Sequence, residues 1–209
     1  MPLPTKAMHC IDNAPPMSAN AANPSSTWSS LRHAPFRALW QSGSLYFVGN
    51  AMQTMAAAWM MVELTGSSFL AALVQTAVFL PMFLLSLPAG VLADITDRKR
   101  LIVGALAVQA VTGSLLALLL ALGMGGAAVL LFFIFVSGAC TAMMSPAWNS
   151  TVADSIPRDE LPQAITAVAI AYNGARAIGP ALAGVVFSLA GGSWNFVIAV
   201  LCTLLMLQS

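Results

Sequence analysis

The chain has 209 residues, of which 59% are hydrophobic and 7% are charged, and its formal net charge is +1. Average soluble domains carry about 25% charged residues. A chain this apolar cannot hide its hydrophobic side chains in one aqueous core, so lipid must solvate most of them. This composition excludes a soluble domain and predicts an all-α membrane protein.

Residues 1–37 precede the first apolar run and are rich in Pro, Ser, Asn and Ala. Their composition predicts a disordered cytoplasmic tail. The tail lacks the apolar stretch of a cleavable signal peptide, and the run that follows is long enough to span a membrane by itself. Residues 38–209 are predicted to form a six-helix transmembrane bundle that stops within or just after its sixth helix.

Six segments are long and apolar enough to cross a hydrocarbon core, which takes roughly 20 residues. Turn-forming or charged residues separate the segments, and the intervening loops are short, so consecutive helices must run antiparallel. The predicted spans are residues 43–62, 69–92, 101–122, 127–144, 163–190 and 194–207.

The basic residues outside the spans predict the orientation, because Lys and Arg in short loops stay on the cytoplasmic side. They occur only before span one and in every second loop after it. They are Lys6, Arg32 and Arg37 in the tail, Arg98, Lys99 and Arg100 after span two, and Arg158 after span four. This alternation places the amino terminus in the cytoplasm.

Span one carries two amides at helical spacing, Asn50 and Gln53, in register with Tyr46 and Ala57. Lipid would penalise these amides, so we expect this helix to line a cavity. Asn50 and Gln53 are therefore candidate residues of a substrate path. Weaker candidates for the same path, for which interhelical hydrogen bonding is the alternative role, are Gln75, Ser137 and Thr141.

The loop between spans two and three mixes a helix-ending glycine, two acids and three consecutive bases in residues 90–100. Anchoring on the cytoplasmic side would explain the bases but not Asp94 and Asp97, because acids contribute little to topology. The alternative is that the carboxylates cap a neighbouring helix amino terminus and bind nearby guanidinium groups.

Span five contains Arg176, an ionisable residue well inside an apolar segment. Placing a charge there costs about 2.5 to 3.5 kcal/mol on insertion scales, and such a residue is by default a functional site with a partner. At about 100° per residue, Thr166, Asn173 and Arg176 share one face. A structural arginine bonded to backbone carbonyls is the alternative.

The opposite face of span five is a stripe of small residues that recur every fourth position, which lets another helix approach closely. Pro180 removes a backbone donor and should bend or loosen the helix. One side of this helix is therefore expected to pack and the other to face a polar cavity, although close packing alone would also explain the stripe. The stripe comprises Ala167, Ala171, Ala175, Gly179 and Ala183.

These motifs together resemble the major facilitator superfamily. Gly90, Asp94, Arg98 and Lys99 match its loop 2–3 signature, in which Asp97 stands where a glycine is usual. An acid at that position is familiar in the bacterial branch related to the enterobactin exporter, and other segments look like members of that branch. These are residues 36–40, 52–54, 63–65, 145–148, 157–162 and 173–184.

Residues 174–184 resemble the GxxxGPxxGG pattern of antiporter members, matched by Gly179, Pro180 and Gly184, with Ala175 and Ala183 in place of two glycines. The resemblance implies the amino-terminal half of a major facilitator fold, with a 3+3 inverted repeat. Substrate would bind between this half and a missing carboxyl-terminal half of six helices, against which the equivalent of Asp94 works.

The implied function is proton-coupled efflux of a small organic molecule across the bacterial inner membrane. The spans contain no paired acids, no Ser with a His and no metal-ligand set, so we expect neither an enzyme nor a cofactor or metal, and no nucleic-acid partner. The alternative functions are a self-contained six-helix channel or structural protein, or a non-functional transporter fragment.

Overall fold

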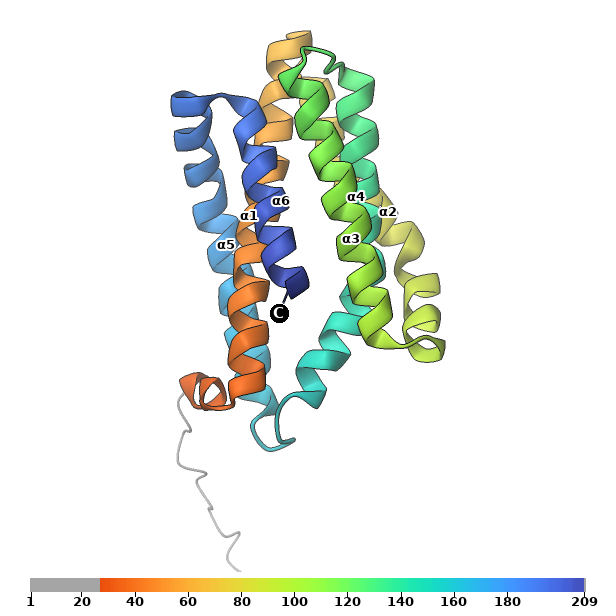
Figure 1. The fold of residues 1–209 in the computed structure, drawn as a ribbon, viewed down its shortest axis with the longest axis vertical. Coiled ribbons are helices and arrows are strands. Elements are labelled where there is room, and N and C mark those ends of the chain that lie inside the picture. The colour runs from red at the N-terminus through yellow and green to blue at the C-terminus, as the bar shows by residue number, and fades with distance from the viewer. Residues whose placement is uncertain (1–26, 209) are drawn as a thin grey trace, which may run out of the picture.

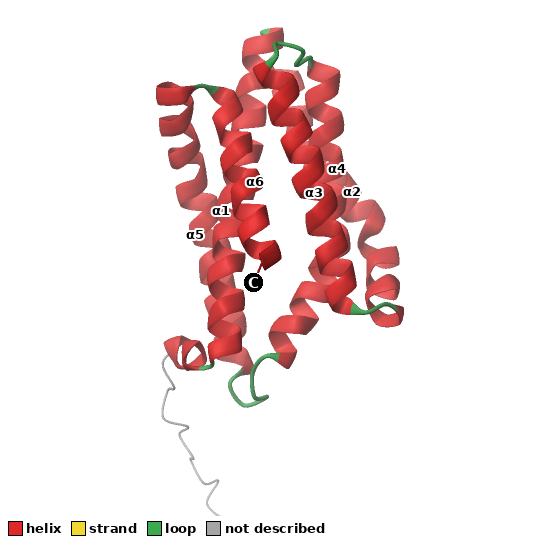
Figure 2. Ribbon diagram, in the orientation of Figure 1, coloured by secondary structure: helices red, strands yellow, loops and turns green. Residues whose placement is uncertain are grey.

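The computed structural model describes residues 27–208, which form one short 3-10 helix and six α-helices (Figure 1). Within this range there is no strand, and the loops lie at the two ends of the bundle (Figure 2). The prediction of an all-α fold with six helices is confirmed. The elements are η2 Thr27–Arg32, α1 Ala34–Thr65, α2 Ser68–Ile95, α3 Arg98–Ala121, α4 Ala127–Asp154, α5 Leu161–Ala190 and α6 Gly192–Gln208.

Several helices extend beyond the predicted spans. Part of the predicted tail, residues 1–26, lies outside the described residues, but residues 27–37 form η2 and the first turn of α1. α1 begins early because Pro35 suits the first turn of a helix, where its missing N–H is not needed. α4 continues past its predicted end at Met144 and through Pro146, which neighbouring helices can accommodate within a membrane.

By length and hydropathy alone, α2, α3 and α4 can cross a membrane, while α6 is apolar but has only 17 residues. α1 and α5 are longer still. Their mean hydropathy is too low for the same criterion, because α1 contains Asn50 and Gln53, and α5 contains Asn173 and Arg176. The polar candidate residues thus lie on the two longest helices.

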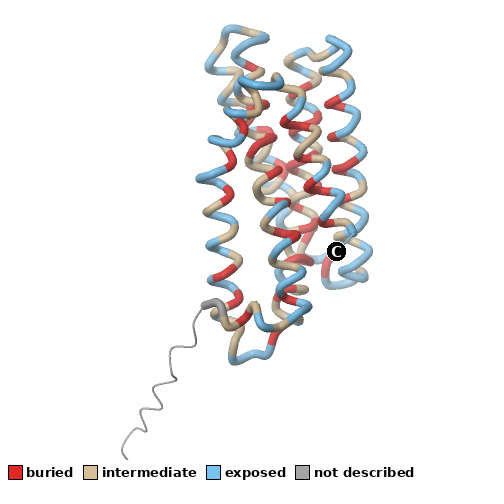
Figure 3. Tube along the Cα trace, turned by 60° about the vertical axis from the view of Figure 1, so that its left-hand side comes forward, coloured by how far each residue is buried: buried red, intermediate tan, exposed pale blue. Residues whose placement is uncertain are grey.

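The helices form a bundle that is open on one side. α1 packs against α5, α6 and α2, α4 packs against α2 and α3, and α3 packs against α6. α2 and α5 make no contact with each other, and α4 meets α5 only marginally. Buried positions lie on the helix faces that turn toward other helices, and exposed positions lie on the outer faces (Figure 3). α2 and α5 are therefore the two edges of the open face.

Two apolar clusters fill the interior, one toward each end of the bundle. The cluster at the end that holds the α1–α2 and α3–α4 loops includes Ala56, Met61, Val74, Leu116, Leu130, Ile134 and Phe196. The cluster at the other end includes Phe36, Leu106, Met144, Trp148, Val152, Ala164 and Met206. Each cluster combines side chains from at least four helices, so the helices are held together along the length of the bundle.

Candidate functional site

The small-residue stripe of α5 packs against α1. Gly179 lies so close to Ala51 that an added Cβ would be 2.5 Å from the Ala51 Cβ. About three turns earlier on both helices, the Trp40 indole N–H donates to the Ala167 carbonyl at 2.9 Å. The two contacts show that α1 and α5 run parallel in a fixed register. Close packing of the stripe, predicted from the sequence, is what the structure shows.

The opposite face of α5 is open. Thr166, Asn173 and Arg176 are all exposed, as their helical spacing predicts. The Asn173 amide donates to the Ala169 carbonyl of its own helix at 2.8 Å. Among residues 27–208, Arg176 is the only Asp, Glu, Lys or Arg in the middle third of any helix, and it forms no ion pair with them. A role of Asn173 and Arg176 in a substrate path remains a prediction.

An aromatic ladder runs from Arg176 into the bundle, and the sequence did not predict it. The Arg176 guanidinium carbon lies 5.8 Å from the ring centroid of Tyr172. The Tyr172 ring meets Phe47 of α1 at 5.3 Å and 87°, and Phe47 meets Trp148 of α4 at 6.4 Å and 84°. We call Tyr172, Phe47 and Trp148 the aromatic ladder. It links α5, α1 and α4, so the flank of α5 that carries Arg176 lies on the side of α1 and α4.

The predicted polar face of α1 is mostly buried within the bundle. Tyr46 is 2% exposed and Gln53 is 6% exposed, while Asn50 is half-buried. Of the two amides, only Asn50 is therefore partly accessible from the open face. A direct role of Gln53 in a substrate path requires a conformation that exposes it.

A buried polar network joins α1, α3 and α4. The Tyr46 hydroxyl donates to Gln109 Oε1 at 3.0 Å and lies 3.0 Å from Thr141 Oγ1, and Gln109 Nε2 donates to Ser137 Oγ at 3.0 Å. Buried polar groups in a membrane must find partners inside the protein. Ser137 and Thr141 thus have the interhelical role considered for them. Gln109, which the apolar appearance of span three concealed, bonds Ser137 directly and is connected to Thr141 through Tyr46.

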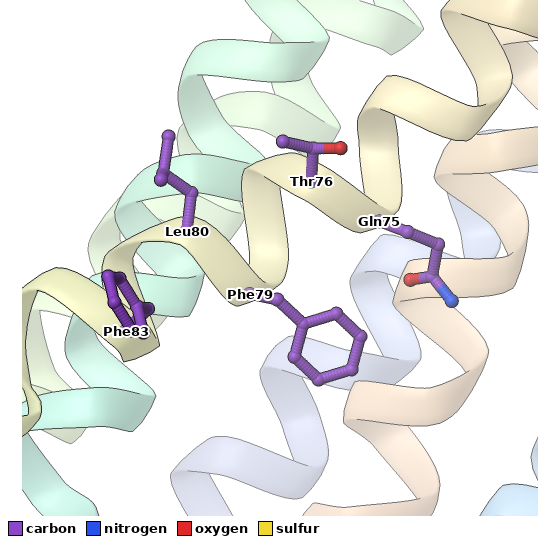
Figure 4. Close-up of a pocket in the computed structure, with 5 residues that line it drawn as sticks. All are labelled: Gln75, Thr76, Phe79, Leu80 and Phe83. Carbon is purple, nitrogen blue, oxygen red and sulfur yellow. The ribbon is translucent and has the colours of Figure 1, made fainter.

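The third weak candidate, Gln75, lies on the other edge of the open face. It lines a shallow hollow on α2 together with Thr76, Phe79, Leu80 and Phe83 (Figure 4). All five residues are on a single helix, and Phe83 is 80% exposed. The hollow is therefore an uncovered helix surface and not an enclosed binding pocket.

The loop 2–3 motif is organised around Asp97. Asp97 is the N-cap of α3, and its carboxylate accepts a hydrogen bond from the Lys99 backbone N–H at 2.9 Å. The Arg100 Nε lies 3.9 Å from the same carboxylate. Arg98 donates to Asp154 at the end of α4, a pairing that the sequence did not predict. Where a glycine is usual, this chain therefore has an aspartate that caps the start of a helix.

Asp94 behaves differently from Asp97. It is exposed near the end of α2, and no residue in the described part of the chain forms a hydrogen bond or ion pair with its carboxylate. Gly90, one turn earlier, has open space where a Cβ would stand. No described residue therefore explains why a glycine and an acid stand at these positions. No group of three or more His, Cys, Asp or Glu comes together among residues 27–208.

Comparison with known proteins agrees with the fold. Residues 25–209 match the family described as transmembrane secretion effector. Macrolide efflux protein A of Streptococcus pyogenes, and the same protein of a serotype M6 strain, are each 26% identical to this chain over 126 residues. The aligned stretch covers 60% of this chain and 31% of each relative, so the chain matches about a third of their length. Because the family match covers all of the described residues, the chain belongs to the transmembrane secretion effector family of the major facilitator superfamily.

Proposed function

We propose that this chain forms the first six helices of an efflux transporter that moves a small organic molecule out of the bacterial cytoplasm in exchange for protons. The observation that carries the proposal is Arg176, a charged side chain exposed at mid-helix on the open side of the bundle. A charge at this depth is costly in lipid and marks a polar path. The name of the relatives, macrolide efflux protein, supports export over import.

The open face supports alternating access between two halves. Transporters of this superfamily hold substrate between two six-helix bundles that rock against each other. Here α2 and α5 stand apart, and Asp94 has no partner among the described residues. We propose that both features are completed by a second half, which the resemblance predicts, and that Asp94 acts on a helix of that half. The enterobactin-exporter branch stays a prediction, and siderophores and drugs are both candidate substrates.

Transport by the complete reading frame that encodes this chain would test the proposal. The gene would be expressed in a bacterial strain that lacks its own multidrug pumps, and the cellular content of candidate drugs and siderophores would be measured over time. We expect lower accumulation of at least one compound, and loss of the effect when a protonophore collapses the proton gradient. Unchanged accumulation of every compound, with the protein present in the membrane, would contradict the proposal.

A matched pair of acid substitutions tests the role of the open face. Asp94→Asn should reduce transport by about tenfold or more without changing the unfolding temperature, because Asp94 has no partner within the described residues. Asp159→Asn, on the exposed α4–α5 loop, changes the same charge at the same end of the bundle and should leave transport intact. Equal transport by both variants would contradict the role proposed for Asp94.

A further inference from the structure

We infer that Arg176 and the aromatic ladder form a binding surface for an aromatic carboxylate, so that the transported molecule carries a ring and an anionic group. This inference rests on the proposed function and adds the chemical class of the substrate. It starts from the composition of the open face. In the middle third of the described helices the only charge is positive, so the surface is matched to an anion and repels a cation.

The side chain of Arg176 is free to bind such a group. It is exposed and forms no ion pair with residues 27–208. Its guanidinium lies 5.8 Å from the Tyr172 ring centroid, within the range of a cation–π interaction, which restrains the side chain without using its hydrogen-bond donors. A planar guanidinium can donate two parallel bonds to a carboxylate, and these bonds are strong where water is scarce.

The aromatic ladder supplies the apolar part of the surface. Tyr172 is 42% exposed, and Phe47 is half-buried beside it, with the two rings nearly perpendicular. Behind Phe47, Trp148 is 5% exposed and fixes the ring from α4. Aromatic side chains offer large contact areas and favour edge-to-face or offset contacts with another ring. A ring that extends from the carboxylate held by Arg176 would meet the accessible edge of this ladder.

Polar groups beside the ladder fit the same ligand. Asn50 lies about one turn after Phe47 on α1 and is half-buried, so it follows the ladder along the same helix. Asn173 is exposed next to Tyr172, and its amide nitrogen is already bonded to Ala169, which leaves its oxygen as an acceptor for a hydroxyl. The surface therefore combines one cation, a wall of rings and amides, and suits an aromatic acid with hydroxyl groups better than an aliphatic amine.

Binding of three probes of equal shape tests the inference. The full-length protein in nanodiscs would be titrated by calorimetry with 2-naphthoate, the neutral 2-naphthamide and the cationic 2-naphthylmethylammonium, with protein-free nanodiscs as the blank. We expect naphthoate to bind at least about tenfold more tightly than naphthamide, because a hydrogen bond to a charged group contributes more than a neutral one. Naphthamide should in turn bind more tightly than the cation.

Variants assign that preference to the proposed residues. Arg176→Gln should abolish the preference for naphthoate while it keeps naphthamide binding, which also shows that the variant is folded. Arg176→Lys should retain part of the preference for naphthoate. Tyr172→Leu should weaken the binding of both naphthoate and naphthamide. Arg158→Gln, on the α4–α5 loop, is the matched control and should bind as the unmodified protein does.

Three outcomes would overturn the inference: equal binding of naphthoate and naphthamide, tightest binding of the cation, or an undiminished naphthoate preference in Arg176→Gln. These outcomes are distinct from failure of the proposed function. A protein that exports a neutral or cationic compound but ignores naphthoate would keep the transport proposal and lose the substrate class. A protein that binds naphthoate selectively and exports nothing would keep the binding preference and lose the transport proposal.

Discussion

The buried hydroxyl of Tyr46 lies at the junction between the two apolar clusters of the bundle. It bonds Gln109, which stands between Leu106 of one cluster and Leu116 of the other. Hydrogen bonds between membrane helices contribute only about 0.6 kcal/mol on average. Their removal can cost more when one partner stays buried without a replacement. Gln109 Oε1 would be such a partner, so Tyr46 is expected to fix how α1, α3 and α4 fit together.

Tyr46→Phe should lower the free energy of unfolding by about 1–2 kcal/mol, because it leaves the Gln109 oxygen without its donor. The measurement is thermal unfolding of the purified protein in detergent. Gln109→Leu combined with Tyr46→Phe should cost less than the sum of the two single changes, since the pair is then removed together. Ser114→Ala is the control, because that hydroxyl only bonds the Ala110 carbonyl of its own helix. Additive effects would contradict the coupling.

At the scale of elements, glycines mark where helices approach each other most closely. Gly179 brings α5 onto α1, and Gly138 brings α4 onto α2, where an added Cβ would lie 2.6 Å from the Val78 carbonyl oxygen. Pro81 stands at the second contact, and because it has no N–H, the Ala77 carbonyl loses its helical donor. Ala77 and Val78 can present their carbonyls to α4 only because residue 138 has no side chain. The contact of α5 with α1 and the contact of α4 with α2 thus define the packing on either side of the open face.

Two glycines of α5 provide a direct comparison. Gly179→Ala should destabilise the protein by about 1–3 kcal/mol, since its Cβ would overlap Ala51. Gly184→Ala should be neutral or stabilising by up to about 1 kcal/mol, because open space surrounds that position and alanine favours a helix. Thermal unfolding in detergent measures both. Ala51→Gly should rescue Gly179→Ala, and failure to rescue would argue against the α1–α5 contact.

For the molecule as a whole, one end of the bundle carries almost all of the charge. Within residues 27–208, the end with the α2–α3 and α4–α5 loops holds every Lys and Arg except Arg176, whereas the opposite end holds only Glu63. Lys and Arg near the membrane favour the cytoplasmic side. Two side-chain contacts connect different elements at this end: an ion pair of Arg98 with Asp154, and His33 Nε2, which lies 3.4 Å from the Glu160 carboxylate. Because the Arg98 and Asp154 side chains are largely exposed, their ion pair contributes at most about 1 kcal/mol.

The charge distribution predicts which end faces the cytoplasm. Alkaline phosphatase, which is active only outside the cytoplasm, should be active when fused after Gly125 in the α3–α4 loop. The same enzyme fused after Asp159 in the α4–α5 loop should be inactive, and green fluorescent protein at that position should be fluorescent. The reverse pattern of activities would show that the amino terminus faces outward.

Sequence periodicity accounts for much of this fold, and the limits of the prediction have physical causes. The stripe on α5 was predictable because a helix places every fourth residue on one face. The same spacing places Gly179 on the stripe and Gly184 off it, but only the arrangement of the helices shows that Gly179 contacts Ala51. The sequence also could not pair Arg98 with Asp154, or Gln109 with Tyr46, because such contacts depend on how helices far apart in the chain are arranged. The aromatic ladder was missed for the same reason.

The separation of α2 from α5 has a mechanical consequence. Since the two helices share no contact, no side chain of one fixes the distance to the other, and the packed connection between them runs through α1 and α4. α1 contacts α5 at Gly179 and is connected to α2 by a short loop. It is therefore the helix that connects the two edges of the open face. A movement of α2 at its charged end can therefore reach Arg176 only through the helices that pack between α2 and α5.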